Sequence, residues 1–214
     1  TCVFKQESIK FFEGLPEGLI YFITIDPAYS KKESADYTAI IVNGVDWHGN
    51  WFIVEAVRER MEIAESVNKL FHLVDKYGEN NVMCIGLEKW VLEKILRKAI
   101  EEESLKRGKF LVIKELETNT RVSKEARIMA LQPRFESGKI HIRKDQDALY
   151  HEILFYPQVK HDDLLDALKS QIDIVFSSPY KSSKKEKDMP ELTRNEKYAW
   201  DNAEKHFKRR VKER

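Results

Sequence analysis

The feature that most constrains this chain is a short apolar run that stops at an acidic residue. Residues 20–25 are mostly apolar, Asp26 follows them, and Pro27 comes next. Proline lacks an N–H and has a fixed φ angle, so it ends a strand at this point. The pattern places the Asp26 carboxylate at a strand end, where a fold can hold it rigidly and still expose it to water. Taken alone, Asp26 is better explained as a turn residue before proline.

Two further β-rich runs follow before any helical pattern begins. Residues 38–43 and 51–57 are rich in β-branched and aromatic side chains, and residues 44–50 between them have the composition of a hairpin turn. We therefore expect the first three strands to form an antiparallel meander.

The next two segments indicate a helix and a buried parallel strand. Apolar side chains recur at helical spacing over residues 62–77, and Gly78 stands just past the expected helix end. Residues 82–87 form a continuous apolar run that is typical of a strand buried on both faces, and this run ends at Glu88. If this strand lies beside the first one, as the rules for βαβ connections allow, Asp26 and Glu88 meet at one edge of the sheet.

The remaining elements follow from periodicity and from helix start and stop signals. Residues 1–19 look like a lead-in with turns. Further along, the patterns predict a helix from Val91 that ends before Gly108, a strand at 110–113, a helix opened by Ser123 and stopped by Pro133, a turn and strand within 135–142, a helix at 145–155 and a last core helix at 161–176.

Charge and composition bound the domain organisation. The 214 residues carry 37 Lys and Arg against 36 Asp and Glu, so the net charge of +1 does not by itself indicate a nucleic-acid-binding protein. Residues 179–214 hold 12 basic and 7 acidic side chains, which leaves 25 and 29 for residues 1–178. We expect one domain over residues 1–178 and a basic, flexible tail over residues 179–214.

Several classes of protein are disfavoured. No apolar run approaches the roughly 20 residues that span a bilayer, and the first residues lack the apolar core of a signal peptide, so we expect a protein that is neither membrane-bound nor secreted. Cys2 and Cys84 are a single distant pair, which argues against a disulfide framework and against a cysteine-rich zinc site.

The acidic residues at element ends suggest a metal site. Asp163 and Asp166 are three residues apart in the last core helix, so both side chains project to the same side. Each acid alone is equally explained by solvation or by helix capping. Together with Asp26 and Glu88, however, they form a set of hard oxygen ligands that selects Mg²⁺ or Mn²⁺. Two such ions about 3.5–4 Å apart would polarise a phosphodiester and activate a water molecule.

The order of the expected elements is that of the ribonuclease H-like fold, an α/β fold whose mixed sheet combines an antiparallel meander with parallel strands. Within this fold, the chain resembles the C-terminal nuclease domain of the large terminase subunit of tailed double-stranded DNA bacteriophages. The resemblance runs from about residue 4 to residue 176. It rests on the Asp26 strand with the later Asp36, on residues 85–88, and most specifically on residues 124–138 and 161–167.

The resemblance implies roles for particular residues. Asp26, Glu88 and Asp163 would bind the catalytic Mg²⁺ or Mn²⁺, as two ions, with Asp166 and Asp36 as nearby contributors whose share varies within the family. Whether Asp162, Asp163 or Asp166 ligates metal directly stays open. The basic residues that could grip phosphates beside the cut are Lys89, Arg121, Lys124 and Arg127, for each of which solvated surface is the alternative.

The resemblance also implies an activity and partners. The chain would be an endonuclease that cuts concatemeric double-stranded viral DNA during packaging, at the viral prohead in the host cytoplasm, alongside the small terminase subunit and the portal. Gly44 and Gly49 have the spacing of a phosphate-binding loop, but Asn50 stands where the lysine belongs. The ATPase domain of a terminase would therefore be a part that this sequence does not contain.

Two other functions are compatible with the same residues. The chain could be another ribonuclease H-like nuclease, such as a junction resolvase or a ribonuclease. It could also be a non-catalytic docking module of a packaging motor, with structural carboxylates and a partner-binding basic tail. His161 and Trp90 are better explained as residues of helix starts than as a metal ligand and a base-stacking platform.

Overall fold

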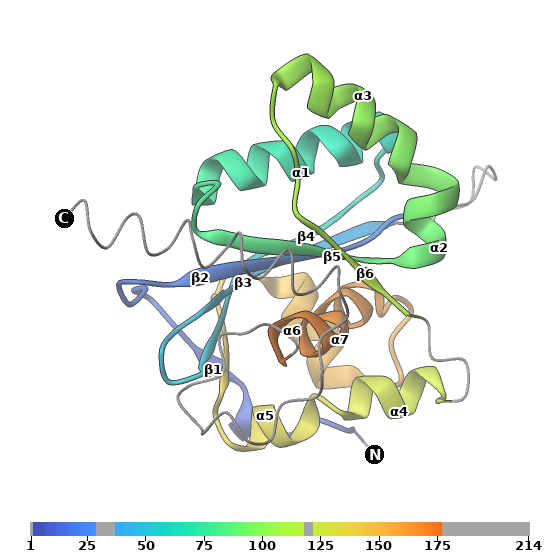
Figure 1. Ribbon diagram of the computed structural model, residues 1–214. Coiled ribbons are helices and arrows are strands. Elements are labelled where there is room, and N and C mark those ends of the chain that lie inside the picture. The colour runs from blue at the N-terminus through green and yellow to red at the C-terminus, as the bar shows by residue number, and fades with distance from the viewer. Residues whose placement is uncertain (1, 29–36, 118–121, 177–214) are drawn as a thin grey trace, which may run out of the picture. The chain divides into compact units, whose positions relative to one another are not determined.

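Seven strands form one mixed sheet in the computed structural model, which describes residues 2–28, 37–117 and 122–176 (Figure 1). The strand order is β1-β7-β4-β3-β2-β5-β6. The strands are β1 (Lys10–Phe11), β2 (Ile20–Asp26), β3 (Thr38–Val45), β4 (Trp51–Glu59), β5 (Val82–Glu88), β6 (Ile113–Leu116) and β7 (Ile140–Ile142).

The pairing of the strands confirms the expected mixed sheet. β2, β3 and β4 are antiparallel neighbours and form the predicted meander. On one side, β5 and β6 continue the sheet in parallel from β2, and on the other side β7 and β1 continue it in parallel from β4. Every residue of β3 is buried, as expected for a strand with neighbours on both edges and helices on both faces.

Helices cover both faces of this sheet. Figure 1 shows α1, α2 and α3 on one side and α4 to α7 on the other. The helices are η1 (Gln6–Ser8), α1 (Ile63–Tyr77), α2 (Lys89–Val91), the π-helical turn η2 (Leu92–Leu96), α3 (Arg97–Arg107), α4 (Lys124–Met129), α5 (Gln132–Glu136), α6 (Asp147–Phe155) and α7 (Asp163–Phe176).

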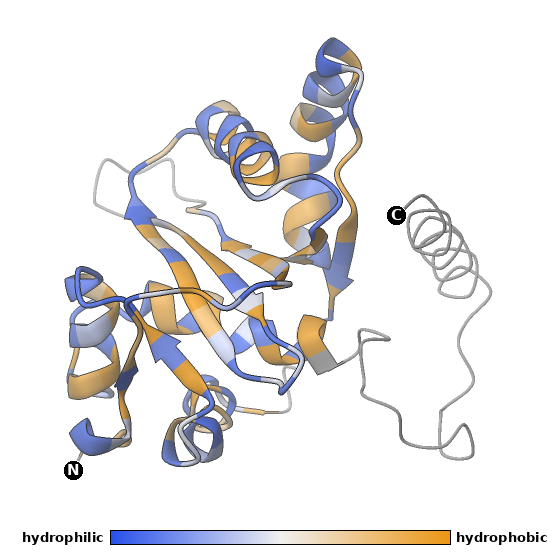
Figure 2. Cartoon of the chain, turned by 90° about the vertical axis from the view of Figure 1, so that its left-hand side faces the viewer, coloured by the Kyte–Doolittle hydropathy of each residue, from blue (hydrophilic) through white to orange (hydrophobic). Residues whose placement is uncertain are grey.

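Two apolar cores result from the alternation of side chains along the strands. Phe22 packs into the core that contains Leu164 of α7, whereas its neighbour Ile23 packs into the core that contains Leu70 of α1. Successive side chains of a strand point to opposite faces, so one apolar strand serves both cores. The strands are accordingly coloured mostly as hydrophobic in Figure 2.

The predicted strand at residues 110–113 was wrong by three residues. β6 begins at Ile113, which lies beside Ile85 of β5, while Phe110 and Val112 are 73% and 62% exposed. Apolar composition favours a strand anywhere in this run, but the ladder begins only where the chain comes alongside β5. The register is therefore a tertiary property.

Pro133 was predicted to stop a helix and instead helps to begin one. It lies in the first turn of α5, after α4 has already ended at Met129. The first N–H groups of a helix have no partner within the helix, so a residue without an N–H is tolerated there. Ser123 begins α4 as predicted, and its Oγ accepts a hydrogen bond from the backbone N–H of Ala126 at 3.2 Å.

The expected lead-in holds more structure than its turn residues suggested, because it contributes β1, which pairs with β7. Three predictions, on Asp36, Arg121 and the tail at 179–214, fall outside the described residues. Within the described residues, no helix has both the length and the apolar character to cross a membrane.

Candidate metal centre

Asp26 and Glu88 end two neighbouring parallel strands. The register of β2 and β5 places Thr24 beside Gly86, two residues before each acid. Residues two apart in a strand lie on the same face. Asp26 and Glu88 therefore lie side by side at the carboxyl ends of their strands, on the face that α7 covers.

Helix α7 is held directly against these strands. The Thr24 hydroxyl donates a hydrogen bond to the Ala167 carbonyl at 2.7 Å, and the buried Gln171 Nε2 donates to Thr24 Oγ1 at 3.0 Å. Gly86 allows the close approach, since a Cβ there would lie 2.7 Å from Cγ2 of Ile174. These contacts fix the middle of α7, and so they set the position of its first turn near the two acids.

The first turn of α7 carries Asp163 and Asp166. The pKa of Asp26 is raised to about 7, first by burial and then by the negative charges of Asp166, Glu88 and Asp163. The four acids that the sequence singled out therefore lie within electrostatic reach of one another. The fifth, Asp36, is outside the described residues.

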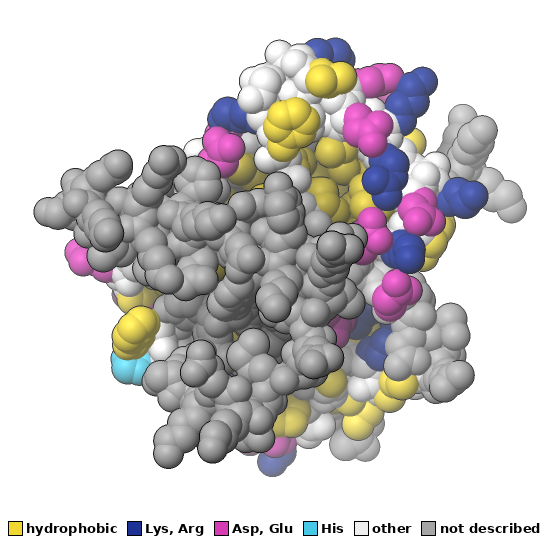
Figure 3. Space-filling view, viewed as in Figure 1, with side chains coloured by type: hydrophobic (Ala, Val, Ile, Leu, Met, Phe, Trp, Pro, Cys, Tyr) yellow, Lys and Arg dark blue, Asp and Glu magenta, His cyan; other side chains and the backbone are white. Residues whose placement is uncertain are grey.

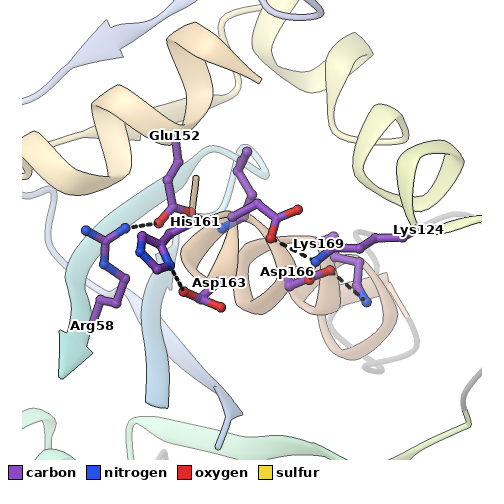
Figure 4. A network of polar contacts seen from close by, with 9 residues as sticks. Arg58, Lys124, Glu152, His161, Asp163, Asp166 and Lys169 are labelled. Atoms are coloured by element: carbon purple, nitrogen blue, oxygen red, sulfur yellow. Dashed lines mark hydrogen bonds and ion pairs between the residues drawn. The ribbon is translucent and has the colours of Figure 1, made fainter. Parts of the chain in front are cut away.

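Two lysines contact the acids of α7 (Figure 4). Lys124 Nζ lies 2.8 Å from Asp162 Oδ1 and also pairs with Asp166 Oδ2, and Lys169 Nζ lies 3.4 Å from Asp166 Oδ1. Burial alone would lower the pKa of Lys124, but its hydrogen bonds to the two carboxylates raise it. Lys124 thus offsets part of the negative charge of the cluster.

The other acids differ in their partners. Glu88 Oε2 accepts a hydrogen bond from Trp90 Nε1 at 2.7 Å, which explains a half-exposed tryptophan at the start of α2. Asp163 Oδ2 is buried without a hydrogen-bond partner among the described residues, and His161 Nδ1 lies 3.7 Å away from it. Burial raises the pKa of Asp163, and the neighbouring Asp162 adds to this effect.

The donor set suits a hard divalent cation. Among the described residues, no three His, Cys, Asp or Glu side chains are arranged to enclose a metal ion. All the candidate donors are nevertheless carboxylate oxygens, which Mg²⁺ and Mn²⁺ prefer. Burial and the neighbouring acids disfavour the charged form of Asp26, and Asp163 Oδ2 has no hydrogen-bond partner among the described residues, so a bound cation would stabilise both carboxylates.

Sequence reasoning missed Glu152 and Arg58. The Glu152 side chain is 1% exposed, and its Oε1 lies 2.7 Å from Arg58 Nη1. Burial raises the pKa of Glu152 to about 7, although the hydrogen bonds from Leu165 N–H and Arg58 act in the opposite direction. The available signal was that Glu152 lies on the apolar face of its helix, between the buried Leu149 and Ile153.

The predicted phosphate-binding residues have different surroundings. Lys89 begins α2 directly after Glu88 and lies 3.6 Å from Glu117, whereas Arg127 has a buried Nε without a hydrogen-bond partner among the described residues. Lys124 points toward the acids, and Arg121 is outside the described residues. Basic and acidic side chains alternate on the right of Figure 3, on the side where Figure 1 draws α2.

Comparison with solved structures connects this fold to terminase nucleases. The nuclease of the large terminase from thermophilic phage G20c, with bound zinc, matches over 78% of this chain and 94% of its own, with a TM-score of 0.58 and 17% identity. The large terminase nuclease domain of Thermus phage P74-26 matches over 79% and 93%, with a TM-score of 0.55 and 20% identity. The fold is that of the terminase nuclease domains.

The terminase nuclease fold is also present within a longer protein. The large terminase of a further thermophilic bacteriophage matches over 81% of this chain but only 44% of its own, with a TM-score of 0.58 and 12% identity. This chain therefore spans less than half of that terminase. No protein-family profile matches the sequence, and no curated protein does.

Proposed function

We propose that this chain is a divalent-metal-dependent endonuclease that cuts double-stranded concatemeric viral DNA during genome packaging. The observation that carries the proposal is the meeting of Asp26 and Glu88, at the ends of two adjacent parallel strands, with the first turn of α7. Solved nucleases of the G20c terminase with the same fold contain bound zinc or magnesium. They support divalent-metal binding by a protein of this fold.

In this proposal, Asp26, Glu88 and Asp163 hold the metal, while Asp166 and Asp36 contribute to the same site. A pair of bound Mg²⁺ or Mn²⁺ ions would polarise the phosphodiester, lower the pKa of the attacking water and stabilise the leaving oxygen. The chain itself supplies rigidity, because the strand ends and the packed helix α7 hold the acids in place.

Basic residues around the acids would hold the DNA backbone. Lys89 and Lys124 adjoin the acids, and Arg127 and Arg121 belong to the same segment as Lys124. Contacts to phosphate give affinity that does not depend on base sequence and that weakens with salt. Such contacts suit a nuclease with little sequence preference.

The packaging role implies partners outside this sequence. We expect an ATPase domain, a small terminase subunit and a portal to place the nuclease at the viral prohead in the host cytoplasm. Residues 1–178 would be the nuclease domain, and residues 179–214 a basic tail.

Incubation with supercoiled plasmid tests the metal site. The wild type should nick or linearise the plasmid with Mn²⁺ and lose this activity with chelator, and Asp26→Asn should reduce the rate by at least about a hundredfold, since it removes a central ligand. Asp75→Asn is the matched control, because Asp75 lies on α1 and pairs with Lys109 on the other side of the sheet. Equal nicking by Asp26→Asn and Asp75→Asn would refute the assignment.

The same assay distinguishes the other functions. Preferential cleavage of four-way junctions or of RNA:DNA hybrids would favour a different ribonuclease H-like nuclease. A wild type without activity on any of these substrates, but with stable binding to portal, would favour the docking module.

A further inference from the structure

A buried ion pair joins three elements beside the candidate metal centre. Glu152 of α6 accepts a hydrogen bond from Arg58 of β4 at 2.7 Å and, with its second oxygen, from the backbone N–H of Leu165 at 3.0 Å (Figure 4). The Glu152 side chain is 1% exposed and that of Arg58 is 25% exposed. A carboxylate this deeply buried is retained only where its hydrogen bonds compensate for its lost hydration.

The bond to Leu165 acts on the start of α7. Leu165 is the third residue of this helix, and the first bond within the helix is donated by Asp166 N–H to the Asp162 carbonyl at 2.9 Å. The N–H of Leu165 therefore lacks a partner inside the helix. Glu152 supplies that partner from another helix, and its negative charge also suits the positive end of the helix dipole.

Arg58, the partner of Glu152, lies in line with Asp26 across three neighbouring strands of the sheet. Ala39 of β3 lies directly opposite both Asp26 of β2 and Arg58 of β4. Residues that are directly opposite in an antiparallel pair share a face, so all three side chains face α7. With strands about 4.8 Å apart, the backbones of Arg58 and Asp26 are separated by roughly 10 Å.

A second contact reaches His161, two residues before Asp163. The guanidinium of Arg58 lies over the ring of Tyr37, 5.5 Å from its centroid. The same ring meets His161 edge to face, with centroids 5.2 Å apart. Arg58 thus contacts the start of α7 by two routes, through Glu152 and through Tyr37 with His161.

We propose that Glu152 and Arg58 are positioning residues that hold the first turn of α7 so that Asp163 and Asp166 face Asp26 at the end of the sheet. The consequence for metal binding rests on the proposed function. One residue of a helix corresponds to a rotation of about 100°. A first turn that unwound or slipped by one residue would therefore turn Asp163 away from Asp26.

The alternative is that the pair only stabilises the fold. Glu55 provides a matched comparison, because it also lies on β4 and binds a helix, through Lys76 and Tyr77 of α1, with 16% of its side chain exposed. It does so on the opposite face of the sheet from the acids. Glu55→Gln should therefore lower the stability of the fold without moving the first turn of α7.

The test compares the full-length wild type with Glu152→Gln, Arg58→Met, Arg58→Lys and Glu55→Gln. Mn²⁺ affinity is measured by calorimetry well below the melting temperature of each variant, and backbone hydrogen exchange is measured on the metal-free proteins. Glu152→Gln and Arg58→Met should weaken Mn²⁺ binding by about tenfold or more, the scale of effect seen when groups that orient metal ligands are lost. Arg58→Lys should recover most of the affinity, and Glu55→Gln should bind Mn²⁺ like the wild type.

Hydrogen exchange separates this inference from the proposed function. The Leu165 amide should exchange at least about tenfold faster in Glu152→Gln, because its bonding partner is weakened, and at the wild-type rate in Glu55→Gln. If the wild type binds no Mn²⁺, the proposed function fails. Faster exchange of the Leu165 amide in Glu152→Gln would still support the inference that Glu152 holds the first turn of α7.

Three results would overturn the inference. One is unchanged Mn²⁺ affinity in Glu152→Gln despite a lower melting temperature. Another is an equal loss of affinity in Glu152→Gln and Glu55→Gln, which would indicate a general loss of stability. The third is an unchanged rate of exchange at Leu165. If Glu152→Gln does not fold, the difference between Arg58→Met and Arg58→Lys decides in the same way.

Discussion

At the scale of single residues, the site is defined by charge that the chain compensates only in part. Asp26 is partly buried near three other carboxylates, and its pKa is raised to about 7. Lys124 and Lys169 pair with Asp166, but Asp163 Oδ2 has no hydrogen-bond partner among the described residues. The stability of the metal-free protein should therefore depend on pH. It should also change when either an acidic or a basic side chain of the site is replaced by a neutral one.

Asp26 should make the metal-free protein less stable as the pH rises. Its folded-state pKa of about 7 exceeds the ordinary value of 3.8, so the folded state retains a proton that the unfolded state releases. The stabilisation is fully present below pH 4 and is lost as the pH rises through 7. Asp26→Asn avoids this loss, so above pH 7 it should be more stable than the wild type by up to about 4 kcal/mol.

Thermal denaturation with chelator between pH 4 and pH 8 measures this difference. It should be several degrees at high pH, at about 2–4 °C per kcal/mol, and near zero at pH 4. A difference that does not change with pH would contradict the assignment of the titration to Asp26.

Lys124 should compete with a divalent cation for the α7 acids. Its ammonium group pairs with Asp162 and Asp166 and is 41% exposed. An ion pair of this exposure contributes at most about 1 kcal/mol. Lys124→Gln should therefore destabilise the metal-free protein slightly and tighten Mn²⁺ binding by up to about fivefold.

Calorimetry with Mn²⁺ tests this competition. Lys98→Gln is the control, because Lys98 pairs only loosely with Glu102 on α3, at 3.7 Å and with 89% of its side chain exposed. Weaker Mn²⁺ binding in Lys124→Gln than in this control would show that Lys124 assists the cation instead of competing with it.

At the scale of elements, the site depends on how closely α7 approaches the sheet. Thr24 and Gln171 bond the helix to β2, and Gly86 leaves room for Ile174. Asp163 and Asp166 lie in the first turn of this packed helix, so a shift of the helix would move them together. The packing of α7 against the sheet therefore affects the positions of the site acids, although the packed side chains are not themselves part of the site.

Gly86→Ala should both destabilise the fold and weaken metal binding. The new methyl group would lie 2.7 Å from Ile174 and 3.1 Å from Thr24, so the Ile174 side chain or the helix that carries it has to shift. Overpacking of this kind costs about 1–3 kcal/mol. Gly14→Ala is the control, since a Cβ at Gly14 meets no atom within 4 Å.

Urea unfolding and Mn²⁺ titration measure the two effects of Gly86→Ala. A loss of stability with unchanged Mn²⁺ affinity would mean that α7 absorbs the extra methyl group without moving its acids.

At the scale of the whole chain, net charge differs between residues 1–178, which are acidic on balance, and residues 179–214, which are basic. Residues 179–214 carry 12 basic and 7 acidic side chains, whereas the acids of the site all lie before residue 178. The proposed metal ligands therefore all precede the last 36 residues. Their positive charge suits an acidic partner, which can be DNA or a protein of the packaging machinery.

A chain that ends at residue 178 should still nick plasmid with Mn²⁺, at a rate within about threefold of the full chain at high salt, where long-range attraction is screened. The plasmid assay measures this rate, and a portal-binding assay measures the partner contact. Loss of nicking on truncation would assign the tail a part in cleavage, and unchanged portal binding would exclude it as the docking segment.

Sequence patterns predicted those parts of the fold that depend on neighbouring residues. The meander, α1, β5 and α7 follow from periodicity and from turn residues, and the terminal acids Asp26 and Glu88 follow from where the strands stop. The register of β6 did not follow, because it depends on where the chain comes alongside β5. The role of Pro133 depended on the end of the preceding helix.

The sequence by itself thus determined which acids stand at the ends of which elements. Only the tertiary structure decided which side chains support them. Glu152 and Arg58 are 94 residues apart in the chain, and Lys124 and Asp162 are 38 apart. Local periodicity carries no information on such pairs, because the path of the backbone through the whole domain brings them into contact.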